Sequence, residues 1–521
     1  MLFTEPTFLF LFLPILLALY VLPGDRYRNW LLVIASVVFY AKGGGAFMWL
    51  IAASIAFNYV GAIRVDQYRD TSAGPWLLRG IVAINLLVLA IFKYANFIAD
   101  NANVLLAGIG APTLSIPPVL LPIGISFFTF HAISYVVDVH RRDASAQKHP
   151  VEAALYLLLF PQLIAGPIIR YREIASQLAR RIVTSDDLAY GIRRFIIGFA
   201  KKMLVANIVA GPADQIFAMP SAQLTAGHAW LAIVCYTLQI YFDFSGYSDM
   251  AIGLGRMFGF RFPENFRYPY IATSVQEFWR RWHMSLSAWF RDYVYVPLGG
   301  NRVGTSRLYL NLVTVFFLCG LWHGASWNFV IWGLFHGAFL VIERLGVAAR
   351  VEALWRPVRH AYLLVVVMIG WVFFRADTLP SALAFLTAMT GFGQARPTLY
   401  DVTWYLTPEV VLALVVGAIA ATPIAPAIAA WLSGPAQAGP YMGKAAAATA
   451  GPHIGEAAAA AAGPYVTEAG APRRTWGPPS GGPTLAWLPS AVATAGLVGL
   501  LAASVMLSAA RTYNPFIYFR F

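Results

Sequence analysis

The chain has 521 residues, of which 59% are hydrophobic and only 12% are charged, and its mean hydropathy is +0.64. Soluble domains carry roughly 25% charged residues, so a soluble protein of this composition could not cover its own surface with polar groups. The formal net charge of +13 does not indicate nucleic-acid binding. The basic residues stand between apolar segments, as in cytosolic loops of membrane proteins, and no nucleic-acid-binding motif accompanies them.

Apolar segments that approach or exceed the length of a membrane span recur along almost the whole chain. They lie near residues 8–22, 29–41 with 46–63, 77–97, 117–138, 151–168, 190–210, 228–242, 325–342, 361–374, 407–431 and 485–508. The first lacks the basic region and cleavage site of a secretory signal, so we expect it to remain as a transmembrane segment. Roughly ten to thirteen segments result, some too short to cross alone. The sequence therefore predicts one all-α, polytopic membrane domain over residues 1–521.

Residues 434–483 differ from the rest because they are rich in Ala, Gly and Pro. The triplet AGP recurs at Ala438, Ala450 and Ala462. Three short copies interrupted by Gly and Pro cannot build a solenoid core. This composition predicts a low-complexity loop before the last span, with His453 as a solvated loop residue.

The segment YTLQIYFDFSGYSDMAIGLGRMFGF, residues 236–260, places polar residues inside an apolar run. Asp243, Ser245 and Tyr247 are candidates for the lining of an interior site, because charged and polar residues inside a membrane usually face a wet cavity. A short loop at the membrane interface is the alternative interpretation, and the sequence leaves both open.

Aromatic and basic residues alternate in TSVQEFWRRWHMSLSAWFRDYVYVPLGGNRVG, residues 273–304. This pattern is typical of the cytosolic membrane interface, where Trp lies among headgroups and Arg reaches toward water. Arg280, Arg281 and Arg291 are also candidates for binding the phosphates of an anionic acyl donor. His283 stands in the middle of this segment, and taken singly it is more often structural than catalytic.

The next segment, LYLNLVTVFFLCGLWHGASWNFVIWGLFHGAFLVIERLG, predicts a helical hairpin. The apolar run 308–321 would rise only about 21 Å as a helix, less than the roughly 30 Å of the hydrocarbon layer. If both basic flanks are cytosolic, Trp322 and His323 lie at a turn within or near the far half of the membrane. Trp322 is therefore a further candidate for the lining of an interior site. An imidazole there is costly unless it serves a site or has a good partner. We expect His336, thirteen residues further on, to be a hydrogen-bonded packing residue.

Several of these segments resemble signature motifs of the bacterial membrane-bound O-acyltransferases. The motifs are LWHGASWNFVIWGLFHG, FWRRWHMSLSAWFRDYVYVPLGG, YFDFSGYSDMAIGLGRMFG, LPIGISFFTFHAISYVVDVHR, FPQLIAGPIIRY and the terminal NPFIYFRF. They occur in one order over nearly the whole chain, apart from residues 434–483. The likeness is greatest to members that take part in alginate O-acetylation and bacterial cellulose acetylation.

This resemblance implies a ring of tilted transmembrane helices with re-entrant segments around a central tunnel. It places the family's principal histidine at His323 and its second functional histidine at His283. His323 would activate an acceptor hydroxyl or carry the acetyl group, and His283 would orient or polarise the donor thioester. The expected protein is a multi-pass O-acetyltransferase of a bacterial inner membrane. It would take acetyl groups from acetyl-CoA and pass them toward a polysaccharide such as alginate or cellulose, through a periplasmic acetyltransferase partner.

Other chemistries find little support in the sequence. It contains no nucleophile elbow, Walker A motif, zincin motif or paired Cys-x-x-Cys, so we expect no metal and no tightly bound cofactor. Cys235 and Cys319 stand in apolar runs and do not indicate a disulfide framework. Two alternatives remain open: a transporter or flippase, and a non-catalytic conduit that passes acetyl groups to a periplasmic transferase. The identity of the acetylated polymer is not settled by these motifs.

Overall fold

The computed structural model describes residues 1–22, 25–392, 400–424, 427–428, 488–510 and 516, and these residues form helices and no strand. Contacts divide the chain into two units. The first consists of Met1–Ala421 with Gly499–Phe521, and the second of Thr422–Val498. The loop predicted over residues 434–483 lies outside the described residues and stays a prediction.

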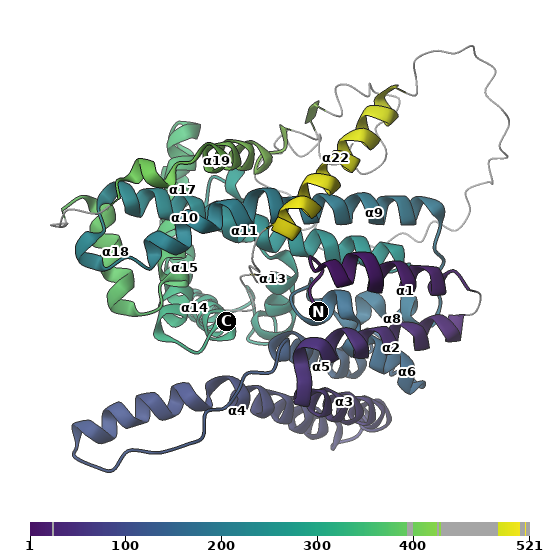
Figure 1. The fold of residues 1–521 in the computed structure, drawn as a ribbon. Helices are drawn as coiled ribbons and strands as arrows, with labels where there is room; N and C mark the ends of the chain where they lie inside the picture. The colour runs from purple at the N-terminus through teal and green to yellow at the C-terminus, as the bar shows by residue number, and fades with distance from the viewer. Residues whose placement is uncertain (23–24, 393–399, 425–426, 429–487, 511–515, 517–521) are drawn as a thin grey trace. The chain divides into compact units, whose positions relative to one another are not determined.

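The helices of the first unit appear in Figure 1. In chain order they are α1 (Leu13–Tyr20), α2 (Asp25–Gly44), α3 (Met48–Tyr68), α4 (Gly74–Gly108), α5 (Ile125–His140), α6 (Pro150–Leu158), α7 (Phe160–Leu163), α8 (Tyr171–Ala179), α9 (Ser185–Ala200), α10 (Asn207–Phe217), α11 (Ala226–Met257), α12 (Val275–Trp279), α13 (Met284–Phe290), α14 (Thr305–His323), α15 (Trp327–Ile342), α16 (Ala348–Glu352), α17 (Arg356–Arg375), α18 (Leu379–Thr390) and α19 (Pro408–Ala420). The last described helix, α22 (Leu488–Ala510), belongs partly to each unit.

Short π- and 3-10-helical turns extend or join these helices. The π-helical turns are Phe8–Phe12, Lys201–Ala206, Arg291–Tyr295 and Glu343–Val347, and the 3-10 turns are Gly45–Phe47, Ser221–Gln223, Pro269–Ile271 and Val402–Tyr405.

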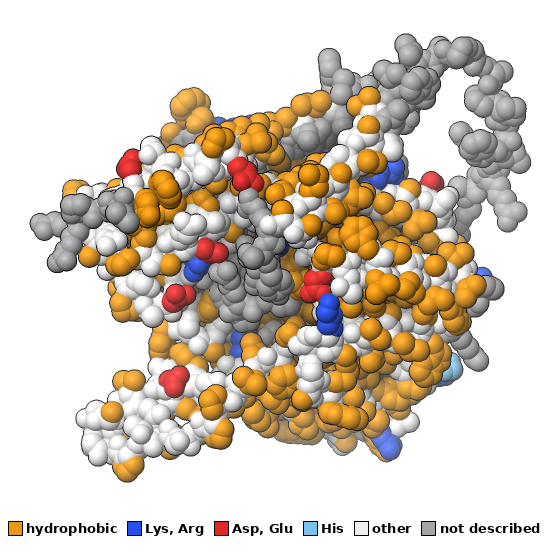
Figure 2. Space-filling model, in the orientation of Figure 1, with side chains coloured by type: hydrophobic (Ala, Val, Ile, Leu, Met, Phe, Trp, Pro, Cys, Tyr) orange, Lys and Arg blue, Asp and Glu red, His pale blue; other side chains and the backbone are white. Residues whose placement is uncertain are grey.

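Within the described residues, seven helical stretches are long and apolar enough to cross a membrane. They are Tyr27–Tyr68, Gly74–Gly108, Ser185–Phe217, Thr305–His323, Trp327–Glu352, Arg356–Arg375 and Val492–Ala510. The face in Figure 2 carries mostly hydrophobic side chains and few charged ones, as a lipid-facing surface requires. The prediction of an all-α, polytopic membrane protein is confirmed.

Some predicted segments have different boundaries in the structure. The segment near 117–138 begins as a helix only at Ile125, because residues 111–122 contain four prolines, which lack the amide hydrogen that a helix interior needs. The segment predicted over 228–242 continues as α11 to Met257. The segment near 151–168 is broken at Leu159, between α6 and α7.

Helix α11 lies against α9 and α10 in the interior of the first unit (Figure 1). Two carboxylates of α11 pair with lysines of the π-helical turn that follows α9. Asp243 pairs with Lys202, and Asp249 pairs with Lys201 at 2.7 Å. A charge inside a membrane protein is costly unless it is paired. The π-helical turn that begins at Lys201 lets two consecutive lysines reach the same partner helix.

Candidate active site

The Trp-His-Gly segment lies at the turn between α14 and α15, two helices that pack antiparallel. Gly320 and Gly333 meet where the helices are closest: a Cβ on Gly333 would stand 3.0 Å from the Cα of Gly320. The helices can approach this closely only because both positions lack a side chain. Three residues connect the helices, and His323, at the last position of α14, is only 4% exposed.

Helix α14 is longer than its apolar run suggests. It has 19 residues because it includes the polar turn from Thr305 and continues through Trp322 and His323. It therefore rises roughly 28 Å, close to the roughly 30 Å of the hydrocarbon layer. The turn follows His323, as the sequence predicts, but the estimate of about 21 Å is too short, because it counts only residues 308–321. The depth of His323 in the membrane stays a prediction.

Aromatic rings surround His323. Ring centroids of Trp322 and Trp332 each lie 4.9 Å from that of His323, and that of Phe374 lies 5.2 Å away. Trp332 belongs to α15 and Phe374 to α17, so three helices form this enclosure. The imidazole is thereby held in a largely apolar environment, where a proton transfer is not screened by bulk water.

His283 reaches the same place from a different segment. It stands between α12 and α13 with φ 44°, one of three described non-glycine residues with positive φ. Such a backbone is uncommon for residues other than glycine and recurs at functional sites. Its buried ring lies 6.5 Å from that of His323 and 6.1 Å from that of Trp322, centroid to centroid. The structure thus brings together two histidines that are forty residues apart in the sequence.

The side chain of Asn265 determines which nitrogen of His283 carries the proton. Its Oδ1 accepts hydrogen bonds from the backbone amide and the hydroxyl of Ser285, at 3.3 and 2.9 Å. The Nδ2 donates to Ser248 Oγ at 3.0 Å. Since the Asn265 atom that lies 3.1 Å from His283 Nδ1 is this oxygen, Nδ1 must be the protonated nitrogen. The basic lone pair of neutral His283 is therefore on Nε2.

The polar residues of α11 lie inside a continuous helix, so the alternative of an interfacial loop is wrong for this segment. Asp243, Ser245 and Tyr247 are all buried. Asp243 pairs with Lys202, and the ring of Tyr247 stacks on that of Phe3 at 4.8 Å. Their role as site lining stays a prediction.

A residue of α11 that was not predicted, Phe244, contacts the catalytic candidate His283. Its ring centroid lies 4.6 Å from that of His283. Trp322, a predicted lining residue, contacts both histidines.

A pocket of about 240 Å³ lies among α12, α13, α14 and α15, and neither histidine is among its lining residues. Its wall is largely apolar, and its edge carries three exposed arginines, Arg280, Arg291 and Arg344. Cys319, one helical turn before His323, also lines it. The lining residues are Gln276, Trp279, Arg280, Leu286, Ser287, Phe290, Arg291, Tyr295, Asn301, Leu312, Val315, Phe316, Cys319, Leu340 and Arg344. An apolar cavity with a cationic edge suits a ligand that has an apolar arm and an anionic head.

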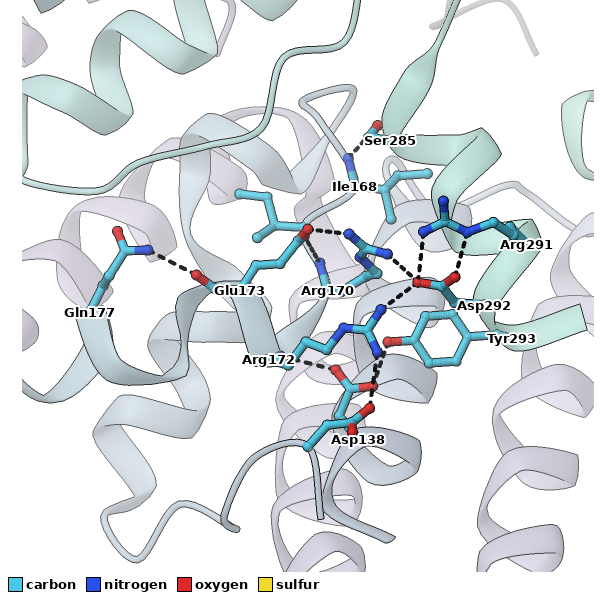
Figure 3. A network of polar contacts seen from close by, with 12 residues as sticks. Asp138, Ile168, Arg170, Arg172, Glu173, Gln177, Ser285, Arg291, Asp292 and Tyr293 are labelled. Atoms are coloured by element: carbon cyan, nitrogen blue, oxygen red, sulfur yellow. Dashed lines mark hydrogen bonds and ion pairs between the residues drawn. The ribbon is translucent and has the colours of Figure 1, made fainter. Parts of the chain in front are cut away.

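Arg291 is held by the polar network in Figure 3. Asp292 accepts hydrogen bonds from Arg291, at 2.7 Å, and from Arg170 and Arg172 of the chain around α8. Tyr293 donates to Asp138 of α5 at 2.6 Å. Burial alone would raise the pKa of Asp292, but Arg291, Arg170 and Arg172 outweigh it and hold that pKa below its usual value. The network ties the segment that follows α13 to α5 and α8.

Two predicted residues are arranged differently from expectation. Arg281 does not line the pocket: it pairs with Glu277 at 2.8 Å and donates to the carbonyl of Arg267. His336 packs as predicted, with ring centroids of Trp279 and Trp332 at 5.1 and 5.2 Å. Neither of its ring nitrogens has a hydrogen-bond partner in the described part of the chain, so the expected hydrogen bond is absent there.

Sequence analysis missed Asn265, Phe244 and Arg344. Asn265 lies in a polar connection without regular periodicity, and Arg344 is one of several arginines near a helix end. In the sequence, the one indication of a role for Phe244 is that it lies within the motif YFDFSGYSDMAIGLGRMFG.

The chain is similar to several known proteins. The model of MBOAT, the membrane-bound O-acyltransferase family, matches residues 123–376, which include both histidines and Asn265. A Pseudomonas aeruginosa protein named "Probable alginate O-acetylase AlgI" is 43% identical over 100% of both chains. An Azotobacter vinelandii protein of the same name is 49% identical over 75% of this chain and 79% of its own length. The peptidoglycan O-acetyltransferase of Helicobacter pylori is 37% identical over 75% of this chain and 80% of its own.

The similarity to these relatives is too high and too extensive to reflect the fold alone. It includes the hairpin, the segment with His283 and the helices that enclose them. The transporter alternative is therefore not supported, and the chain belongs to the membrane-bound O-acyltransferase family as a multi-pass membrane acyltransferase.

Proposed function

We propose that this acyltransferase is an O-acetyltransferase of a bacterial inner membrane, which moves acetyl groups from cytosolic acetyl-CoA toward an exopolysaccharide such as alginate. The observation that carries the proposal is the meeting of His323 and His283, 6.5 Å apart between ring centroids. A pocket with a cationic edge supports it, because its wall includes Cys319, one helical turn before His323 in α14. The names of the relatives support acetyl as the transferred group and alginate as the polymer.

The pocket fits the donor by its chemistry. Arginine guanidinium groups bind phosphate oxygens through paired hydrogen bonds, and Arg280, Arg291 and Arg344 offer three of them. The apolar wall of Leu286 and Phe316 would receive the pantetheine arm and thioester. Cys319 marks the depth of the pocket one helical turn from His323, so an acyl group inserted past it would approach the histidine.

His323 would act as the base. In the direct route its imidazole takes the proton of an acceptor hydroxyl, the oxygen attacks the thioester carbonyl, the carbon–sulfur bond breaks, and coenzyme A leaves as a thiol after gaining that proton. In the alternative route an imidazole nitrogen attacks the thioester carbonyl first, the carbon–sulfur bond breaks, and coenzyme A leaves as a thiol after gaining the imidazole proton. The acceptor hydroxyl then attacks the acetyl-histidine, takes the acetyl group and returns its proton to the imidazole. His283, with its basic lone pair on Nε2, would orient the thioester or hold a proton beside it.

The acceptor side involves a second protein in this proposal. A membrane enzyme cannot bring a long polymer into an enclosed apolar site, so a periplasmic transferase would receive the acetyl group and deliver it to the polysaccharide. The conduit alternative differs in one respect: there, the partner alone would perform the chemistry.

The test is acetyl-CoA turnover by the purified full chain in nanodiscs, with and without a periplasmic acetyltransferase and an alginate acceptor. We expect His323→Ala to abolish turnover and His283→Ala to reduce it strongly. His228→Ala is the matched control, since His228 is equally buried but contacts Thr225 and Tyr405, which do not line the pocket. Full activity of folded His323→Ala would refute the role of His323. Thioester consumption only when the partner is catalytically intact would favour the conduit.

The two chemical routes differ in a second assay. An acetyl-histidine predicts exchange of labelled coenzyme A into acetyl-CoA when no acceptor is present. Absence of exchange alongside normal transfer would favour the direct route.

A further inference from the structure

At the end of α14 that carries His323, two residues of α4 donate hydrogen bonds to the last backbone carbonyl groups. The last four carbonyl groups of an α-helix have no partner within it. Here the carbonyl of Gly320 accepts from the amide of Gly324, at 3.3 Å. The Leu321 carbonyl accepts from the hydroxyl of Tyr94, at 2.6 Å. The remaining two, of Trp322 and His323, accept from the ammonium group of Lys93.

Lys93 is unusual because it lies within α4, an apolar membrane-spanning helix. Its hydrogen-bond partners in the described part of the chain are these two carbonyls and Ser126 Oγ, at 3.3 Å, and none of them is a carboxylate. The ammonium group also lies 5.9 Å from the ring centroid of Trp322. A cation inside a membrane protein is costly without a counter-charge, but the negative end of a helix dipole and the face of an indole both attract it.

We propose that Lys93 is a positioning residue of the active site, which fixes the terminal turn of α14 and thereby orients Trp322 and His323. Tyr94, the adjacent residue, completes the same clamp through Leu321. The clamp acts on the backbone of the turn, so it sets the direction in which the imidazole points without touching the reacting atoms. The inference rests on the proposed function in one respect, that His323 performs the chemistry.

The first test measures acetyl-CoA turnover of the full chain in nanodiscs. Lys93→Met keeps an unbranched side chain that is one atom shorter and removes its charge. We expect kcat to fall by roughly ten- to a hundredfold, the effect of losing hydrogen bonds from a charged donor. The KM for acetyl-CoA should change by less than about twofold, since the donor pocket is not altered. Lys93→Arg should recover part of the loss, and Tyr94→Phe should give a smaller loss. Lys42→Met, which breaks an exposed pair with Glu5, is the control.

The second test does not depend on acetyl transfer. Amide hydrogen exchange by mass spectrometry should show faster exchange in Lys93→Met over the last turn of α14 and residues 324–328, and unchanged exchange in α9 and α11. If wild-type protein does not consume acetyl-CoA, the proposed function fails, and the exchange pattern still decides on the clamp.

Two results would overturn the inference. One is an unchanged kcat and unchanged local exchange in Lys93→Met. The other is a loss of kcat that accompanies faster exchange throughout the protein and is not relieved by Lys93→Arg, which would make Lys93 a structural residue only.

Discussion

At the scale of single residues, the site depends on the protonation pattern that Asn265 imposes on His283. The backbone amide of Ser285 donates to Asn265 Oδ1, which identifies that atom as the oxygen, and the oxygen can only accept from His283 Nδ1. A histidine with a fixed tautomer presents its basic nitrogen in one direction. Partners that orient a functional histidine in this way contribute to activity without touching the substrate.

Substitution of Asn265 should therefore alter activity in two distinguishable ways. Asn265→Leu removes the acceptor, and we expect kcat to fall by roughly ten- to a hundredfold. Asn265→Asp keeps an acceptor but adds a negative charge, which favours the imidazolium form. Because the imidazole must be neutral to act, the acid limb of the pH–rate profile should move to higher pH. Ser248→Ala, which removes only the Nδ2 contact, is the control. Identical pH profiles for wild type and Asn265→Asp would contradict this role.

Cys319 provides a reporter of the donor pocket. It lines the pocket and is 5% exposed, whereas Cys235 is fully buried elsewhere. In a Cys235→Ala background, a small methanethiosulfonate reagent should modify Cys319, and acetyl-CoA should slow the reaction. Arg344→Ala should raise the acetyl-CoA concentration needed for protection, since one phosphate contact is lost. Modification that saturating acetyl-CoA does not slow would place the donor elsewhere.

At the scale of elements, the segment after α13 is held in place by charge. Asp292 is only 12% exposed and bonds to three arginines, two of which come from the chain around α8 (Figure 3). Removing one partner of a buried ion pair leaves the charges of the remaining partners uncompensated. This lowers the free energy of unfolding more than the loss of an exposed pair does. The same contacts hold Arg291 at the edge of the pocket.

Asp292→Asn should therefore lower the free energy of unfolding by about 2–3 kcal/mol at neutral pH and raise the KM for acetyl-CoA. The pKa of Asp292 is lower in the folded protein, so its contribution is complete above the unfolded pKa of about 3.9 and is lost as the pH falls through the folded value. The stability difference between variant and wild type should shrink in acid, as thermal unfolding would measure.

The matched control is Asp70→Asn, which breaks an exposed pair with Arg142 and should cost at most about 1 kcal/mol. Equal effects of the two substitutions would show that the network contributes no more than a surface pair.

Sequence reasoning named candidates where a residue or its motif carries a signal. His323 is a polar residue in an apolar run, Arg280 and Arg291 stand in a basic, aromatic segment, and His283 was named because its motif resembles one of the family. Their roles in catalysis and donor binding stay predictions, but each could be named from the sequence. Asn265 and Lys93 could not, because their roles depend on which distant segment lies beside them. The end of α14 was also misjudged, since hydropathy stops at Leu321 whereas the backbone hydrogen bonds continue to His323.

At the scale of the whole molecule, the two ends of the hairpin differ in how many basic residues they carry. Arg302 precedes α14, Arg307 lies in its first turn, and Arg344 and Arg350 follow α15. At the opposite end, residues 95–122 and 324–330 contain no lysine or arginine, and the basic residues near that end are Lys93, on the carbonyls of Trp322 and His323, and Arg375, next to the Ala376 that contacts Asn328. Trp327 donates to Asn101 at 2.8 Å, so these two segments share that end. Basic residues concentrate on the cytosolic side of membrane proteins, so the pocket with its arginines should open to the cytosol.

This orientation can be tested by labelling single cysteines in a background of Cys235→Ala and Cys319→Ala. Asp100→Cys and Arg302→Cys place exposed thiols at the two ends. With a membrane-impermeant maleimide on intact spheroplasts, Asp100→Cys should react at once, and Arg302→Cys should react only after the membrane is permeabilised. The reverse pattern would show that the donor pocket opens on the side of the membrane opposite the cytosol. Acetyl-CoA, which is made there and does not cross the membrane, could then not be the donor, even if both histidines proved essential.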